Sequence, residues 1–363
     1  MDQTNIKEKH RFFLLDIIRI ACAFLIYARH SVTMFGCTYG HNLDAAFTML
    51  TSPVMTCFFI LSGFSIHYQH RDEAITAEWM RTFMKKRLIT IMPSYLLLAI
   101  IWPLAFPAQT ADWVALLPVD LFGIQTVYRS LFGILHNGGT WFVSCMLLAY
   151  ILYPIIKAVV TSGKKWIVYL CAFFAQFLLL YSNYIIPRFG MDGLYSNPIA
   201  RSAEFMIGVA FSEILFANRF SVPEKEERPF INWTGWNAVW MIAGSALISF
   251  LIAKITGVGF LDTFIIYLVS PIVMVLLLVS SVLRSPSLEK SKLLAALSGM
   301  SYQFFLMQLF LWNLTIWVLQ VTGLSGNNVK ILGSLILCTV ISYIVWRFYD
   351  KPIRKLLREI MMK

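Results

Sequence analysis

The chain has 363 residues, of which 58% are hydrophobic and only 13% are charged. A soluble domain carries about 25% charged residues, roughly twice this share, so the composition excludes an ordinary soluble globular protein. Repeated apolar runs of about 20 residues predict an all-α, polytopic integral membrane protein, and they lack the alternating pattern of a transmembrane β-barrel. Five of the six cysteines lie in apolar runs without paired spacing, so we expect neither a disulfide framework nor a metal site.

The first apolar run, residues 13–35, is long enough to cross a bilayer but contains Asp16, Arg19, Arg29 and His30. Charges inside a membrane cost about 2.5–3.5 kcal/mol each and usually mark function. On a helix, Arg19 and His30 are about 20° apart on one face and about 16 Å apart along the axis. Asp16 precedes Arg19 by three residues and can pair with it. Arg29 lies on another face, where it is interpreted as an interfacial anchor.

Nine further spans follow this helix. The second covers about 45–68, and the third, about 88–106, begins after a basic segment and has Pro93 in its first turn, where proline is tolerated. The connection 110–137 contains a possible short helix, DWVALLPVDLFG. The remaining spans are predicted at about 140–160, 166–186, 200–217, 236–253, 262–283, 301–321 and 329–349. The tail, 350–363, is predicted to be an amphipathic helix on the inner surface.

The distribution of basic residues orients this arrangement. With the N-terminus inside, 23 of the 30 lysines and arginines fall in inner segments, four in outer segments and three within spans. This bias predicts that both termini are cytoplasmic and that the 110–137 loop is extracytoplasmic. The +11 net charge therefore faces anionic lipid head groups, which argues against nucleic acid as a partner. Residues 1–363 are interpreted as one membrane domain.

Other polar residues allow two interpretations each. The basic run Lys85, Lys86 and Arg87 is either a topology determinant or a grip for an anionic ligand at the cytoplasmic face. Arg201 and Glu204, three residues apart, form either a structural ion pair or part of a polar cavity. The sequence contains no phosphate-binding loop, no dinucleotide GxGxxG, no HExxH and no GxSxG motif.

Several stretches together resemble the acyltransferase 3 family of integral membrane enzymes, which transfer acyl groups to extracytoplasmic acceptors. They are LLDIIRIACAFLIYARH, FFILSGFSI, KRLITIMPSYLL, GGTWFVSCMLLAYILYPII, NPIARSAEFMIGVAFSE, MSYQFFLMQ and YDKPIRKLL. The first contains Asp16, Arg19 and His30 at the family's spacing. The chain departs from the family pattern at Thr90, where a second arginine is common, and at Gln308, where a histidine often ends the motif.

The resemblance implies a membrane O-acyltransferase that moves an acyl group, acetyl in the simplest case, from acyl-CoA to a hydroxyl of a cell-surface polysaccharide or its lipid-linked precursor. It implies a multi-pass protein of the bacterial cell membrane, with acyl-CoA as donor substrate and no permanently bound cofactor or metal. The implied site residues are His30, Arg19 and Asp16 for catalysis, Arg87, Lys86, Lys85 and Tyr95 for donor binding, and Trp141, Arg201, Glu204 and Ser62 for the acceptor or cavity. His30 would act as a general base or carry the acyl group itself.

Two other functions fit the same residues. A lipid or glycan transporter or flippase would use the embedded charges to line a substrate path. A binding or sensor module would use His30 and Arg19 for affinity alone. The sequence leaves open the acceptor, the oligomeric state and whether the acyl group is acetyl, succinyl or longer.

Overall fold

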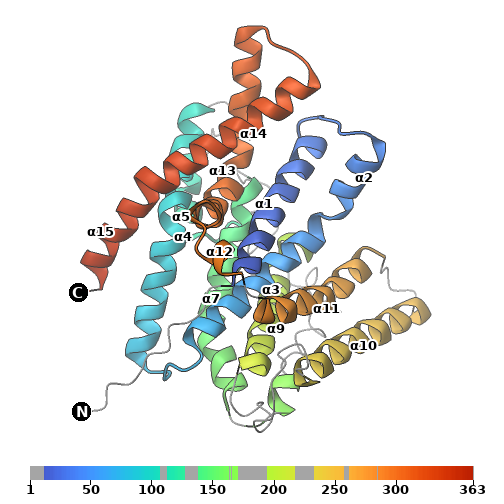
Figure 1. The fold of residues 1–363 in the computed structure, drawn as a ribbon. Coiled ribbons are helices and arrows are strands. Elements are labelled where there is room, and N and C mark those ends of the chain that lie inside the picture. Colours follow the sequence, from blue (N-terminus) through green and yellow to red (C-terminus); the bar gives the residue numbers. More distant parts are fainter. Residues whose placement is uncertain are drawn as a thin grey trace.

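The computed structural model describes residues 12–106, 113–126, 138–162, 164, 166–170, 194–216, 233–256, 261–283 and 285–362 (Figure 1). This part of the chain is helical and contains no strand, which confirms the all-α class. Its α-helices are α1 (Phe13–Thr33), α2 (His41–Met49), α3 (Thr51–His70), α4 (Ala77–Ala105), α5 (Trp113–Phe122), α7 (Trp141–Val160), α9 (Pro198–Phe216), α10 (Trp233–Thr256), α11 (Leu261–Val282), α12 (Pro286–Glu289), α13 (Lys292–Thr322), α14 (Asn327–Ile344) and α15 (Lys351–Met361).

Four helices of the described part are long and apolar enough to cross a membrane: Ala77–Ala105, Trp141–Val160, Lys292–Thr322 and Asn327–Met361. A fifth is added if His41–Met49 and Ser52–His70, which are bent by 42° at their junction, form one broken span. Helices α1 and α9 each carry three charged residues, more than an ordinary span tolerates. The protein is a membrane protein, whereas ten spans and cytoplasmic termini stay predictions. The predicted span at 166–186 lies mostly outside the described residues.

Helices α3 and α9 form the tightest contact of the core through two glycines. A Cβ atom on Gly63 would lie 2.0 Å from the backbone oxygen of Phe205, and one on Gly208 would lie 2.0 Å from the backbone oxygen of Ile60. Only glycine permits two helix backbones to approach this closely, as in other membrane helix pairs. The contact fixes α3, which lines the site described below, against a helix that is buried along nearly its whole length.

Hydrogen bonds join the helix connections at the two ends of the bundle. At one end, Asn327 accepts a hydrogen bond from the Thr38 amide at 2.9 Å and donates to its carbonyl at 2.6 Å, so the connections α1–α2 and α13–α14 lie together (Figure 1). At the other end, the buried Lys157 of α7 donates to the carbonyl groups of His70 and Glu73 in the turn between α3 and α4. At the short connections α3–α4 and α13–α14 the chain reverses, so the two helices of each pair run in opposite directions.

Helix α4 begins at Ala77, well before the predicted start of the third span. Pro93 consequently lies inside the helix rather than in its first turn, so the expectation that a helix start accommodates it was wrong. Its missing N–H leaves a carbonyl one turn earlier without its usual donor. Two other carbonyls near this proline accept hydrogen bonds from tyrosines: Tyr302 donates to Ile91 at 3.0 Å and Tyr349 donates to Pro93 at 3.2 Å.

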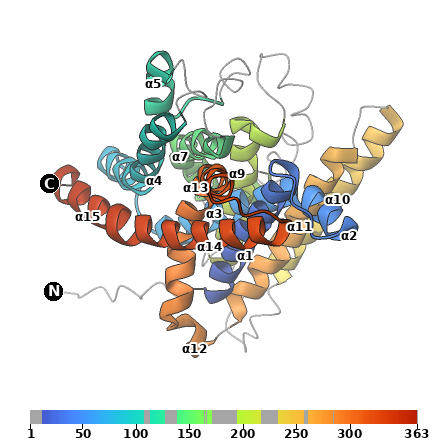
Figure 2. The same cartoon turned by 90° about the horizontal axis from the view of Figure 1, so that it is seen from above.

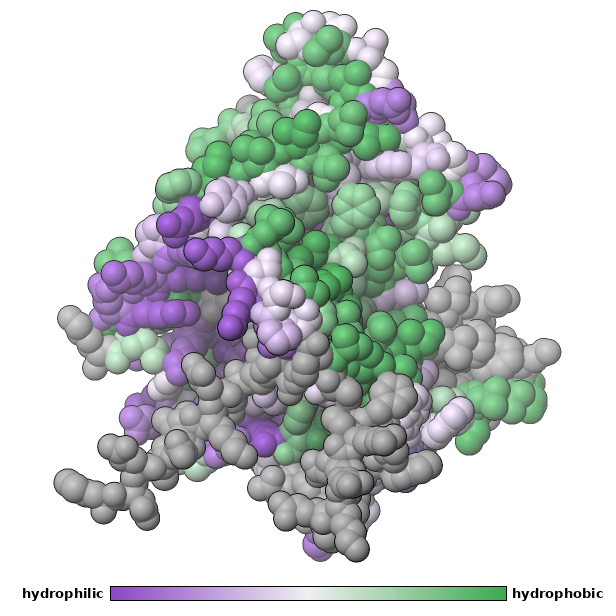
Figure 3. Space-filling model, viewed as in Figure 1, coloured by the Kyte–Doolittle hydropathy of each residue, from purple (hydrophilic) through white to green (hydrophobic). Residues whose placement is uncertain are grey.

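The C-terminal part forms one continuous rod, in which α14 passes through a π-helical segment, η7 (Val345–Asp350), into α15 (Figure 2). The predicted amphipathic tail helix is thus formed as α15. Exposed hydrophobic side chains on α14, such as Leu332 and Ile336, suit contact with lipid. Figure 3 shows hydrophobic residues over the upper part of this face and hydrophilic residues gathered at its lower left.

Candidate active site

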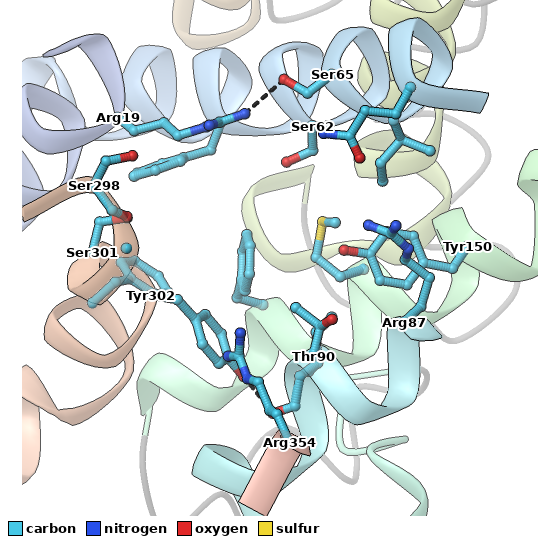
Figure 4. Close-up of a pocket in the computed structure, with 18 residues that line it drawn as sticks. Arg19, Ser62, Ser65, Arg87, Thr90, Tyr150, Ser298, Ser301, Tyr302 and Arg354 are labelled. Carbon is cyan, nitrogen blue, oxygen red and sulfur yellow. Dashed lines mark hydrogen bonds between the residues drawn. The ribbon is translucent and has the colours of Figure 1, made fainter. Parts of the chain in front are cut away.

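A cavity of about 300 Å³ opens between helices α1, α3, α4, α7, α13 and α15 (Figure 4). Among its described lining residues, three are arginines and none is acidic. Its volume is at the lower end of the range for ligand pockets, about 300–1,000 Å³. The polar lining residues are Arg19, Ser62, Ser65, Gln69, Arg87, Thr90, Tyr150, Ser298, Ser301, Tyr302 and Arg354. Guanidinium groups that converge in this way suit an anionic ligand.

Arg19 enters the cavity from α1, where Asp16 holds it. The closest oxygen and nitrogen of this pair are 3.5 Å apart, so the predicted partnership is present. Arg19 Nη2 donates a hydrogen bond of 2.6 Å to Ser65 on α3. Ser298 on α13 donates one of 2.5 Å to Asp16. Three helices therefore meet at this ion pair and fix the guanidinium at the cavity wall.

Arg87 enters from α4 and is held by a chain of two side chains. Its Nη2 lies 3.2 Å from Nε2 of His70, whose Nδ1 lies 2.8 Å from Glu73. A guanidinium only donates, so Nε2 accepts and the imidazole donates its Nδ1 proton to the carboxylate. Burial raises the pKa of Glu73, but hydrogen bonds from His70 and Trp79 outweigh it, and the pKa lies below its ordinary value. The carboxylate is therefore ionised at neutral pH. It orients the His70 ring and, through it, the Arg87 guanidinium.

Arg354 enters the same cavity from α15. Its Nε lies 2.6 Å from Asp350, a carboxylate with no exposed surface. Tyr150 on α7 lies close enough to interact electrostatically with this guanidinium and with those of Arg19 and Arg87. Figure 4 shows the three arginines on different sides of the cavity, all reaching toward its interior.

His30 lies on the same helix as Arg19, about 16 Å further along its axis, and does not line the cavity. The side chain is 5% exposed, and its Nδ1 has no hydrogen-bond partner among the described residues. The ring lies beside the side-chain amide of Gln308 on α13. A buried imidazole nitrogen without a partner is costly in a structural position and is suited to accept a proton or an acyl group.

Arg201 and Glu204 of α9 form a buried ion pair, in which each side chain is 1% exposed. Arg201 Nη1 lies 2.8 Å from both carboxylate oxygens, and Thr56 on α3 donates to one of them at 2.7 Å. Arg201 Nε also donates to the backbone oxygen of Tyr195 at 2.8 Å. The two charges thus compensate each other, which a buried charge requires.

Aromatic rings surround this ion pair. The Arg201 guanidinium lies 5.8 Å from the ring centre of Trp141 and 5.5 Å from that of Tyr195. Arg29 of α1 lies 5.9 Å from the same Tyr195 ring. Arg29 therefore packs on an aromatic residue of the bundle, and its role as an interfacial anchor stays a prediction. The structure brings Trp141, Arg201 and Glu204 together in a cluster separate from the three-arginine cavity, and a role for them toward the acceptor stays a prediction.

The residues predicted to bind the donor do not all reach this cavity. Arg87 lines it. Lys85 instead donates to a backbone carbonyl at the end of α15 at 2.6 Å, and Lys86 is exposed. Tyr95 is buried elsewhere, with its hydroxyl 3.4 Å from Gln125. Ser62, grouped in the prediction with the acceptor residues, lines the three-arginine cavity.

Several residues of the site were not predicted from the sequence. Arg354, Tyr150 and His70 are the most prominent, and two of them, Arg354 and His70, have a weak sequence signal. Asp350 and Arg354 are four residues apart on a helix, the spacing of an ion pair. His70 comes just after the second predicted span, and the acidic residue Glu73 follows it three positions later. Within the described residues, no three His, Cys, Asp or Glu side chains form a group that could hold a metal ion.

A family model described as an acyltransferase domain, that of the acyltransferase 3 family, matches residues 13–347. The chain belongs to the acyltransferase 3 family. This membership makes the protein a membrane acyltransferase and confirms the resemblance drawn from the sequence motifs. The family match includes every predicted site residue and ends within η7, before α15. No curated protein and no solved structure matches the chain.

Proposed function

We propose that this acyltransferase moves an acyl group, acetyl in the simplest case, from cytoplasmic acyl-CoA to a hydroxyl of a cell-surface polysaccharide or its lipid-linked precursor across the bacterial cell membrane. The observation that carries the proposal is the arrangement on α1. Arg19 lies in a cavity with two further arginines, and His30 lies buried on the same helix toward the opposite end. One helix thereby connects an anion-binding cavity with a histidine.

The donor side of the proposal rests on charge. CoA carries several phosphate groups, and arginine binds phosphate through paired N–H donors. Arg19, Arg87 and Arg354 would bind this charged part of the donor, and the exposed Lys85 and Lys86 would attract it to the cytoplasmic face. The pantetheine arm would then extend along α1 and bring the thioester toward His30, about 16 Å from Arg19.

The acceptor side rests on His30 and the aromatic group around Arg201. As a general base, His30 takes the proton of the acceptor hydroxyl while the oxygen of that hydroxyl attacks the thioester carbonyl carbon. The carbon–sulfur bond breaks, and the proton passes to the departing CoA thiolate. In the relay version, the imidazole nitrogen attacks the thioester carbonyl carbon, the carbon–sulfur bond breaks and the CoA thiolate leaves with the imidazole proton. The acceptor oxygen then attacks the acyl-imidazole, the carbon–nitrogen bond breaks, and the hydroxyl proton returns to the imidazole. The rings of Trp141 and Tyr195 offer flat apolar surfaces to a sugar.

Labelled acetyl-CoA provides the test. Membranes from cells that express the protein are incubated with CoA labelled in the acetyl group, and envelope material is analysed for base-labile label. The proposal requires transfer of the acetyl label, whereas CoA labelled in its adenine gives none. Envelope material that stays unlabelled, although the protein is present and folded, contradicts the proposal. Movement of a glycan or lipid that is independent of acyl-CoA would instead support a transporter.

A further inference from the structure

We infer that Arg354, carried by the C-terminal helix α15, is a third ligand for the phosphate groups of the acyl donor, and that buried Asp350 positions it. This inference rests on the proposed function, because it concerns the donor of that reaction. The amphipathic helix α15 is then part of the binding site. Arg354 lies beyond residue 347, where the family match ends, and its assignment rests on its place in the cavity.

Arg354 lies in a partly buried position in the cavity wall. An amphipathic surface helix keeps its charged residues in water or at lipid head groups. The Arg354 side chain is only 20% exposed and lines the cavity opposite Arg19 and beside Tyr302 (Figure 4). Partial burial costs this guanidinium some of its hydration, which the ion pair with Asp350 offsets on one side only.

Buried side chains hold Asp350, the ion-pair partner of this arginine, in place. Asp350, the last residue of the π-helical segment η7, has no exposed surface and accepts a hydrogen bond of 2.8 Å from Ser94 on α4. Ser94 in turn accepts one of 3.1 Å from Gln303 on α13. The π-helical turn inserts an extra residue, which rotates the next turn of the helix about its axis, and such turns recur at functional sites. Asp350 thus points inward and holds Arg354 through its Nε at 2.6 Å.

Each of the three arginines has a carboxylate on the side away from the cavity. Arg19 has Asp16 behind it, Arg354 has Asp350, and Arg87 has the chain through His70 to Glu73. None of the three carboxylates lines the cavity. Each guanidinium is therefore oriented from behind by an acid while its five N–H donors are only partly used. Such preorganised donors suit a ligand that carries several phosphate groups.

Donor kinetics with two thioesters test the inference in the full-length protein. Arg354→Gln is compared with Arg358→Gln, which removes the same charge one turn later on α15 at an exposed position outside the cavity. The donors are acetyl-CoA and S-acetyl-pantetheine, which lacks phosphate. Losing a charge-assisted hydrogen bond raises KM for acetyl-CoA by about ten- to hundredfold in Arg354→Gln. Its kcat stays within about twofold, its KM for S-acetyl-pantetheine is unchanged, and Arg358→Gln behaves as wild type.

Arg354→Lys guards against a folding defect, because it keeps the charge opposite Asp350 but loses the planar fork, and it is expected to give an intermediate KM for acetyl-CoA. Equal losses of Arg354→Gln on both donors would assign Arg354 a structural role and overturn the inference. A KM for acetyl-CoA equal to that of Arg358→Gln would overturn it as well. If the wild-type protein transfers acetyl from neither donor, the proposed function fails first, and this outcome is distinct from the other two.

Discussion

Replacement of Gly208 by alanine tests the packing that holds the site together. The added Cβ would lie 2.0 Å from the backbone oxygen of Ile60 and 2.8 Å from the amide nitrogen of Phe64. Ordinary contact begins near 3.4 Å, so α9 must move by about 1.4 Å away from α3. Overpacking of this kind costs about 1–3 kcal/mol. Because backbone atoms and not flexible side chains receive the methyl group, we expect the upper part of that range.

Gly244→Ala on α10 is the matched control. A Cβ there meets no heavy atom within 4 Å, so the substitution gains helix propensity of about 1 kcal/mol without a clash. Thermal denaturation in detergent, followed by size-exclusion chromatography, should give a lowered midpoint for Gly208→Ala and an equal or raised one for Gly244→Ala. Gly63→Ala separates the same two helices. The double variant Gly63→Ala/Gly208→Ala should therefore lose less stability than the sum of the losses in the two single variants. Equal midpoints for Gly208→Ala and Gly244→Ala would refute the backbone contact.

Three further substitutions probe the charged groups. Glu204→Gln leaves Arg201 buried without its counter-charge and should destabilise the protein by about 3–5 kcal/mol, seen as a lower denaturation midpoint; an unchanged midpoint contradicts the buried pair. Asp16→Asn weakens the hold on Arg19 and should raise KM for acetyl-CoA more than it lowers kcat, and unaltered kinetics would remove this carboxylate from the site. Glu73→Gln loosens the imidazole–guanidinium chain and should raise the same KM by a few-fold; a change in kcat alone would contradict a positioning role.

The first helix could be predicted almost completely from the sequence. Its boundaries, the Asp16–Arg19 pair and the shared face of Arg19 and His30 depend only on helical periodicity within one segment. The same holds for the Arg201–Glu204 pair, which is three residues apart on α9. Interactions within one helix follow from spacing, and spacing is visible in the chain.

The composition of the cavity could not be predicted in this way. Lys85 and Arg87 are two residues apart and differ by about 200° around α4, so only one of them can face the cavity. The helix starts at Ala77, and its packing, which the sequence does not show, decides which one does. Arg354 depends in addition on the extra residue of the π-helical segment, which no periodic pattern reveals. Ser62 lines the cavity from α3, and its neighbour Gly63 contacts α9, a long-range packing that the sequence does not show.

Acyl transfer across the membrane and its dependence on His30 can be measured together in membrane vesicles. Inside-out membrane vesicles expose the cytoplasmic face. They are prepared from three strains, in which the gene for this protein encodes the wild type, His30→Ala or His41→Ala. His41 is an exposed histidine at the start of α2 and serves as the control. Labelled acetyl-CoA is added outside, and base-labile label is measured on material within the vesicles.

We expect label in wild-type and His41→Ala vesicles and a labelling rate at least about a hundredfold lower in His30→Ala vesicles, because a general acid–base group usually contributes at least this factor. The protein content and the denaturation midpoint of the three vesicle preparations should agree. His30→Ala vesicles that label their contents at the wild-type rate would contradict the role of His30 in acyl transfer.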